Sequence, residues 1–152
     1  MDHKMRKKLI IGIIVYALFF TIGCDAKSYQ TEGTSELVGV SMYAEKSQYA
    51  SDDSEINVVW KNNTNWELTF GEFFSISKLD GKEWKSVGKT EIAFNTIGYI
   101  VSAHNEVKHK YNVRVYSDKL EKGTYRILTD FLDVHSPGNY DTYKLTTNFS
   151  VE

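Results

Sequence analysis

From residue 37 to the C-terminus, apolar side chains recur at every second position along short segments. The clearest example is 107–115 (VKHKYNVRV), and the same alternation is found at 38–43, 56–61, 125–131 and 143–151. Neighbouring residues of an extended chain point to opposite sides, so this period gives each segment one apolar and one polar face. Strands of this kind bury their apolar faces when two sheets pack together. We therefore predict an all-β fold, an antiparallel two-sheet sandwich.

Turn-forming residues separate these segments. Asp80-Gly81 lies between two apolar-alternating runs and predicts a hairpin with a type I′ turn, whose two central residues both need positive φ. Further reversals are expected at 52–54, 62–65, 103–105 and 136–139. The segment 91–100 (EIAFNTIGYI) fits either a short strand or a loop that crosses between sheets. No segment predicts a helix longer than a turn or two.

One motif constrains the topology of the sandwich. Leu120, Gly123 and Tyr125 have the Leu-x-x-Gly-x-Tyr spacing of a tyrosine corner. In Greek-key sandwiches the hydroxyl of this Tyr bonds to upstream backbone and fixes a crossover between the sheets. The alternative is an ordinary glycine turn followed by a tyrosine in a strand.

The order of these motifs resembles that of bacterial immunoglobulin-like domains in lipoproteins and surface proteins of Gram-positive bacteria. Four segments carry the resemblance, which covers about 38–151: the strand 56–62, the Gly-aromatic segment 70–76, WKSV at 84–87 and GTYRI at 123–127. The resemblance implies an immunoglobulin-like Greek-key sandwich of about seven strands, located in the cell envelope, with no shared catalytic residue. The chain departs from the family at Ala103-His104, where a turn containing proline is common.

The N-terminal 23 residues are predicted to be a signal peptide, with a helical apolar part. Four of the first eight residues are basic, and 9–20 (LIIGIIVYALFF) carries no charge. As a helix these twelve residues would span roughly 18 Å, against about 30 Å of hydrocarbon in a bilayer. The alternative is an N-terminal anchor that is retained, since tilting and bilayer thinning accommodate short segments.

The chain has a single cysteine, Cys24, directly after this segment. Residues 21–24 (TIGC) resemble the lipobox of bacterial lipoproteins, although Thr21 stands where leucine is usual. The resemblance implies cleavage before Cys24, a diacylglyceryl group on its sulfur and a lipid anchor on the outer face of the cytoplasmic membrane. A buried thiol or a catalytic nucleophile is disfavoured, because 25–36 offers no aliphatic residue larger than Ala26 to build a core.

Residues 24–36 are therefore expected to be the lipidated cysteine and a flexible tether, followed by one domain at 37–152. Twelve flexible residues have a root-mean-square span of about 20 Å. Cleavage leaves 129 residues with 14 basic and 19 acidic side chains, a formal charge of −5. This charge disfavours nucleic acid as a partner. The domain contains no cysteine, so packing alone must stabilise it.

The histidines and carboxylates give little sign of a reaction centre. His104 and His135 lie in expected turns. His109 lies on the apolar face of its strand, where we predict a core or edge histidine whose hydrogen bonds are satisfied. No two of them have the spacing of metal ligands. We predict no catalytic residue, no metal and no cofactor.

Two acidic groups need their own assessment. Asp52, Asp53 and Glu55 are expected to be a solvated turn, with weak calcium binding as the alternative. Asp130 and Asp133 lie near a strand end, where a general acid/base pair would be the catalytic alternative.

Aromatic residues are the better candidates for binding. Trp60 is predicted to be a core residue, whereas Trp66 in an Asn-rich loop and Trp84 on the hairpin are candidates for an exposed binding role. The function predicted is a non-catalytic binding or accessory module that recognises a protein, peptide or envelope glycan. The alternatives are a small hydrolase or an inhibitor of an envelope enzyme, and a spacer without a ligand.

Overall fold

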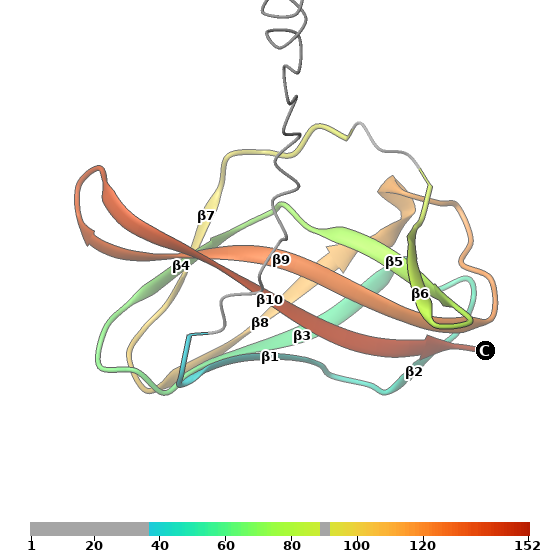
Figure 1. Ribbon diagram of the computed structural model, residues 1–152, viewed down its shortest axis with the longest axis horizontal. Helices are drawn as coiled ribbons and strands as arrows, with labels where there is room; N and C mark the ends of the chain where they lie inside the picture. The colour runs from blue at the N-terminus through green and yellow to red at the C-terminus, as the bar shows by residue number, and fades with distance from the viewer. Residues whose placement is uncertain (1–36, 89–91) are drawn as a thin grey trace, which may run out of the picture. The chain divides into compact units, whose positions relative to one another are not determined.

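The computed structural model describes residues 37–88 and 92–152. These residues form ten strands and one 3-10 helix, arranged as two sheets (Figure 1). The signal peptide, Cys24 and the tether predicted at 1–36 lie outside the described residues. Within the described ranges, no helix is long and apolar enough to cross a membrane.

The smaller sheet has three antiparallel strands in the order β1-β3-β8. Their bounds are Val40–Ala44 for β1, Glu55–Asn62 for β3 and Asn105–Asn112 for β8. β3 is central and pairs along its whole length with β8.

The larger sheet has the order β2-β10-β9-β4-β7, with β5 beside β9 and β6 beside β5. Its strands are β2 (Gln48–Tyr49), β4 (Leu68–Gly71), β5 (Ser75–Asp80), β6 (Glu83–Ser86), β7 (Gly98–Val101), β9 (Gly123–Ser136) and β10 (Asn139–Val151). β4 and β5 follow each other along the same side of β9, with Phe70 opposite Phe131 and Ile76 opposite Ile127. β4 therefore supports β7 at one end of the sheet, and β5 supports β6 at the other.

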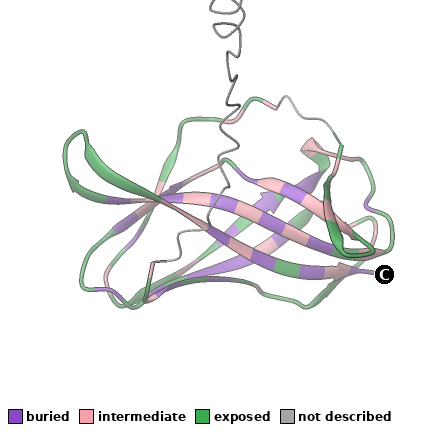
Figure 2. Ribbon diagram, in the orientation of Figure 1, coloured by how far each residue is buried: buried purple, intermediate pink, exposed green. Residues whose placement is uncertain are grey.

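The core lies between the two sheets. Alternating buried and partly buried bands along β9 show which of its residues face inward (Figure 2). Trp60 of β3 stacks on Phe70 of β4 with ring centroids 4.4 Å apart and meets the edge of Phe131. The core role predicted for Trp60 is confirmed by its exposure of 1 %. The all-β sandwich is likewise confirmed, although it has more strands than the seven that the resemblance implied.

The hairpin predicted at Asp80-Gly81 forms, but its turn is shifted by one residue. Asp80 pairs with Glu83, so the loop consists of Gly81 and Lys82. Gly81 has φ 63, whereas Lys82 does not have a positive φ. Positive φ at the first central residue alone is the pattern of a type II′ turn with glycine leading. The type I′ assignment was therefore wrong.

Two strand boundaries also differ from the alternation in the sequence. Val38 is 93 % exposed and precedes β1, which begins at Val40. The strand predicted at 107–115 ends at Asn112, and Val113–Val115 form a 3-10 helix. The side chain of Asn112 accepts the N–H of Arg114, and Val113 donates its N–H to the carbonyl of Ser54. These bonds close a turn in which Val113 is still buried. The alternation of buried residues therefore continues one step beyond the end of the strand, which is why the sequence predicted a longer strand.

The segment with two interpretations, 91–100, contains both elements. Residues 92–97 have no regular secondary structure, and β7 begins at Gly98. The expected reversal at 136–139 is the β9–β10 hairpin, with Pro137 and Gly138 between the paired Ser136 and Asn139. Gly138 has φ 77 after a proline, the residue order that a type II turn favours.

Candidate binding surface

The outer face of the larger sheet carries a group of exposed apolar side chains near β7. The strand register places Ile100, Thr69 and Leu132 in one row across β7, β4 and β9. Val134 and Tyr140 form a pair in the next row toward the β9–β10 turn. Ile100, Val134 and Tyr140 are 54 %, 46 % and 53 % exposed. Exposed apolar groups gathered on one face are typical of interaction sites.

Two glycines make a hollow in this face. Gly71 of β4 lies directly opposite Gly98 of β7, so neither strand places a side chain there. The cavity above them has a volume of about 340 Å³. Its lining includes Thr69, Phe70, Gly71, Phe73, Thr96, Ile97, Gly98, Asp130 and Leu132. A Cβ added at Gly98 would lie 3.2 Å from the methyl group of Thr69, within the hollow. We call this cavity the glycine pocket.

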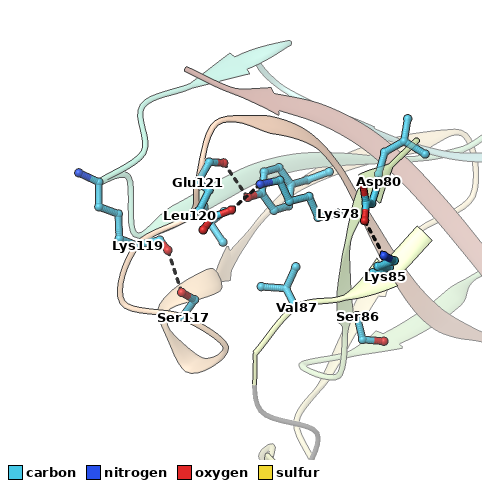
Figure 3. A pocket seen from close by; sticks show the side chains of 11 residues that line it. Lys78, Asp80, Lys85, Ser86, Val87, Ser117, Lys119, Leu120 and Glu121 are labelled. Carbon is cyan, nitrogen blue, oxygen red and sulfur yellow. Dashed lines mark hydrogen bonds and ion pairs between the residues drawn. The ribbon is translucent and has the colours of Figure 1, made fainter. Parts of the chain in front are cut away.

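A second cavity, of about 530 Å³, lies beside the crossover that leads into β9 (Figure 3). Its apolar floor includes Leu120 and Val87, and its rim carries both signs of charge. Lys85 pairs with Asp80 there, in contact across the β5–β6 hairpin. Lys78 pairs with Glu121 in the same way, so four of the five charged side chains in the lining already have partners within the cavity. This cavity therefore offers fewer open contacts to a ligand than its size indicates.

The predicted tyrosine corner lines this second cavity. The buried Tyr125 donates its hydroxyl to the carbonyl of Glu121 at 2.6 Å, four residues upstream. Leu120 is buried beneath the crossover. Lys78 passes over Gly123, where an added Cβ would lie 2.8 Å from the Lys78 Cε, and reaches the Glu121 carboxylate at 2.7 Å. That hydrogen bond raises the pKa of Lys78 and lowers the pKa of Glu121.

A family model described as a bacterial Ig-like domain matches residues 36–150. This match includes every strand of both sheets except the final residue of β10. The chain belongs to the bacterial Ig-like domain family. No significant match to the chain was found among curated proteins or among solved structures. An Ig-like domain is typically a non-catalytic fold, which agrees with the function class expected from the sequence.

The histidines of this Ig-like domain have separate surroundings. The Nε2 atom of His104 lies 2.9 Å from the amide oxygen of Asn65, and His104 has φ 54 in the β7–β8 turn. His135 contacts Asp141 at 3.1 Å and lies 4.0 Å from Asp133, and the hydrogen bond to Asp141 raises the pKa of the imidazole. Catalysis would be supported if both histidines contacted the same acid. In the described structure His104 contacts the amide of Asn65, whereas His135 contacts Asp141, so this arrangement is not formed.

His109 is buried, as predicted from its position on the apolar face, but the prediction that its hydrogen bonds are satisfied was wrong, because its Nε2 has no hydrogen-bond partner in the described structure. Its ring lies within 5.2 Å of the ring centroids of Phe70, Tyr99 and Tyr111. Burial lowers the pKa of His109, while the Glu72 carboxylate, 4.0 Å from Nε2, acts in the opposite direction. Burial also raises the pKa of the neighbouring Tyr111 to about 12.

The acidic residues of this Ig-like domain do not form a reaction centre in the described structure. Asp53 accepts the N–H of Ala50, and Glu55 pairs with Lys110 at 3.2 Å. Asp130 and Asp133 are three positions apart on β9, so they point to opposite faces of the sheet and cannot act as a pair. Among the described residues, no group of three or more His, Cys, Asp and Glu side chains could hold a metal ion.

The two candidate tryptophans lie in different places. Trp66 is 45 % exposed in the β3–β4 loop, where its carbonyl accepts the Asn62 side-chain amide at 2.7 Å. Trp84 lies opposite Leu79 on the β5–β6 hairpin, and the guanidinium carbon of Arg126 is 4.6 Å from its ring centroid. Trp66 is therefore the better candidate for binding, because Arg126 already occupies one face of the Trp84 ring.

Sequence reasoning missed the glycine pocket. Single glycines within strands often mark a site where another chain or ligand approaches closely. Gly71 and Gly98 carry that signal, but the register that brings them opposite each other depends on how β4 and β7 pair, which neither segment reveals alone.

Proposed function

We propose that this Ig-like domain is a non-catalytic binding or accessory module of the bacterial cell envelope, anchored by lipid on Cys24. It would bind a protein partner through the outer face of the larger sheet. The observation that supports this function is the glycine pocket, lined by the exposed side chains of Phe73 and Ile97, with exposed Ile100 opposite the lining residue Thr69. Water-exposed apolar side chains contribute free energy when a partner covers them.

The position of the anchor favours the same function. A flexible tether of about twelve residues has a root-mean-square span of about 20 Å, so it would hold the domain close to the bilayer surface. The sheet face would then be accessible to envelope proteins, peptides or glycans. The net negative charge expected after cleavage favours partners with basic surfaces and disfavours nucleic acid.

Site-specific photo-crosslinking in cells tests the binding face. A photoreactive residue replaces Ile100 of the full chain, and the matched control replaces Lys110 on the opposite sheet. We expect a discrete crosslinked product from position 100 that is absent from position 110. Equal crosslinking at both positions, or none at position 100, would contradict this binding face.

Intact-mass measurement of the membrane-extracted chain tests the anchor separately. We expect a species that begins at Cys24 and carries a diacylglyceryl group, and a Cys24→Ser chain that retains its N-terminal segment. A wild-type species that keeps residues 1–23 with an unmodified thiol would overturn the lipoprotein assignment.

A further inference from the structure

The described part of the domain begins at one end of the sandwich. Residues 37–39 precede β1, and the N–H of Asn63 donates to the carbonyl of Gly39 at 2.7 Å. A Cβ added at Gly39 would lie 3.3 Å from the methyl group of Thr64. The first described residues therefore lie against the β3–β4 loop, and the β7–β8 turn lies at the same end (Figure 1). We call residues 37–39, 63–66 and 102–104 together the tether end.

A buried asparagine holds the tether end in one shape. The side-chain amide of Asn62 donates to the carbonyl of Trp66 at 2.7 Å and to the carbonyl of Val101 at 3.0 Å. Its oxygen accepts both the N–H and the hydroxyl of Thr64. Asn62 thus connects the β3–β4 loop to the end of β7. Side chains carried on a fixed backbone lose less conformational entropy when they contact another surface.

Two large apolar side chains are exposed at the tether end. Val38 is 93 % exposed and Trp66 is 45 % exposed. The segments 37–40, 62–66 and 101–105 contain no Asp, Glu, Lys or Arg. Covering these segments would therefore not require any charged group in them to lose its water, a step that costs free energy.

The opposite end of the sandwich has a different surface. Three connections there, 45–54, 80–85 and 117–122, each carry four charged residues. Residues of the second and third line one cavity, and the N–H of Leu120 donates to the carbonyl of Ser51 in the first. Charged side chains of this kind are nearly always solvated. The two ends of the domain therefore favour different surroundings.

The bilayer is the surface that the tether end reaches most readily. If Cys24 carries lipid, twelve residues separate it from residue 37, with a root-mean-square span of about 20 Å. β10, with thirteen residues, spans about 40 Å along the larger sheet. The tether is thus short compared with the domain and keeps its attachment end nearest the bilayer. Tethering also raises the effective concentration of the surface, so a weak contact is sufficient.

We propose that the tether end rests on the lipid headgroups of the membrane that anchors the chain, with the indole ring of Trp66 at the depth of the headgroups. Tryptophan favours this depth, because its ring is apolar while its N–H can still bond to water or headgroups. This proposal rests on the proposed anchoring and specifies how the anchored domain is oriented. The outer face of the larger sheet would then stay open to a protein partner.

The charges beside the tether end indicate which force would hold this contact. Lys61 lies opposite Glu106 across β3 and β8, and Glu67 is exposed directly after the tryptophan. On the β9–β10 hairpin, Asp141 contacts His135. These residues form no basic patch, so burial of apolar groups rather than attraction to anionic lipid would hold the domain. We therefore expect the contact to persist in about 1 M salt, which screens surface charges.

A fluorescent label tests this orientation on the full chain, reconstituted into phosphatidylcholine vesicles. The label is attached to a cysteine that replaces Asn63 at the tether end or, as the control, Lys82 in the β5–β6 turn. Some of the lipids carry a nitroxide near the headgroup, which quenches labels at that depth. We expect severalfold stronger quenching at position 63 than at position 82, with and without high salt.

Two substitutions connect this quenching to the exposed apolar side chains. Trp66→Ser should reduce the quenching at position 63 to the level at position 82, and Val38→Ser should reduce it in part. The matched control is Tyr43→Ser, because Tyr43 is likewise 45 % exposed but belongs to β1. Urea denaturation checks that the variants are folded, and Val38→Ser decides the question if the Trp66 variant is not.

Three results would overturn this orientation: no quenching at position 63, equal quenching at both positions, or quenching at position 63 that a folded Trp66→Ser or Val38→Ser chain leaves unchanged. The wild-type chain tests the anchor separately, because a Cys24 that carries lipid takes up no label. If the wild-type chain is labelled, the lipid assignment fails, and the two positions are then compared in a Cys24→Ser chain. If crosslinking at position 100 persists without quenching at position 63, the binding function stands and only the contact with lipid is wrong.

Discussion

Tyr125 fixes the crossover into β9 through one hydrogen bond and one contact. Its hydroxyl donates to the carbonyl of Glu121, and the Lys78 ammonium group lies 5.9 Å from its ring centroid. Gly123 allows this arrangement, because a side chain there would displace the Lys78 stem. The motif Leu-x-x-Gly-x-Tyr thus brings a strand, a turn and a lysine from β5 together at one point.

Removing the Tyr125 hydroxyl should reduce stability measurably. We expect Tyr125→Phe to lower the free energy of unfolding by about 1 kcal/mol, because the Glu121 carbonyl loses its partner while the ring stays packed. Urea denaturation measures the change, and Tyr140→Phe is the control, since Tyr140 is half exposed. Equal effects of the two substitutions would show that the corner hydroxyl contributes nothing.

Gly88 and Gly81 provide a matched pair for a steric test. Both have positive φ, 68 and 63, but a Cβ at Gly88 would lie 1.9 Å from the carbonyl oxygen of Tyr116, whereas a Cβ at Gly81 would meet nothing within 4 Å. Both alanine variants are destabilised by the positive φ, so the difference between their free energies of unfolding measures the steric clash with Tyr116. We expect Gly88→Ala to be destabilised by about 2–3 kcal/mol more than Gly81→Ala in urea denaturation. Similar losses would show that the segment after β6 can move away from Tyr116.

At the scale of elements, β8 shows how one strand serves two environments. Lys108 and Lys110 point to solvent. Lys108 pairs with Glu45, which directly follows β1, and Lys110 pairs with Glu55 of β3. Between them, His109 points inward among Phe70, Tyr99 and Tyr111. An imidazole surrounded by aromatic rings is easier to bury when neutral than when protonated.

Stability should therefore fall in mild acid. Burial lowers the pKa of His109 from 6.5 in the folded chain. As the pH drops below about 6.5, the unfolded chain takes up a proton that the folded chain does not, so the free energy of unfolding decreases until the folded pKa is passed. Tyr99, Tyr111 and Glu72 face the imidazole, and only the Glu72 carboxylate, as an anion, favours its protonation.

Urea denaturation between about pH 8 and pH 5 measures this dependence, with His109→Phe expected to flatten it. His135 acts in the opposite direction: its pKa is raised by Asp141, so its contribution is present at low pH and lost as the pH rises. A His135→Asn variant should therefore lose stability more steeply in acid than the wild type. A His109→Phe chain with an unchanged pH dependence would contradict the assignment to His109.

At the scale of the whole molecule, one apolar cluster holds the two sheets together. It contains twenty buried residues drawn from both sheets and from the crossover, and none of them is a cysteine. The single cysteine of the chain precedes the domain. Stability thus comes from packing and backbone pairing, and the aromatic residues supply much of the buried area.

We expect a reductant to leave the thermal midpoint and the cooperativity of unfolding unchanged, because no disulfide constrains the unfolded chain. Circular dichroism with and without dithiothreitol measures this, and a disulfide-bonded Ig domain is the positive control. A midpoint that drops on reduction would indicate an intermolecular bond through Cys24.

The sequence alone determined most of the strands, most turns and the tyrosine-corner spacing, because alternation and turn chemistry are local properties of neighbouring residues. It left β7 open between a strand and a loop and gave no sign of the two-residue strand β2. It also identified Trp60 and His109 as inward-facing. It could not place the type II′ turn or the end of β8, since each depends on pairing with a partner strand. The separation of Asp130 from Asp133 across the sheet, in contrast, follows from their odd spacing along one strand. Above all, only the tertiary structure brought Gly71 opposite Gly98, because the register between strands 27 residues apart is set by how the whole sheet packs on its core.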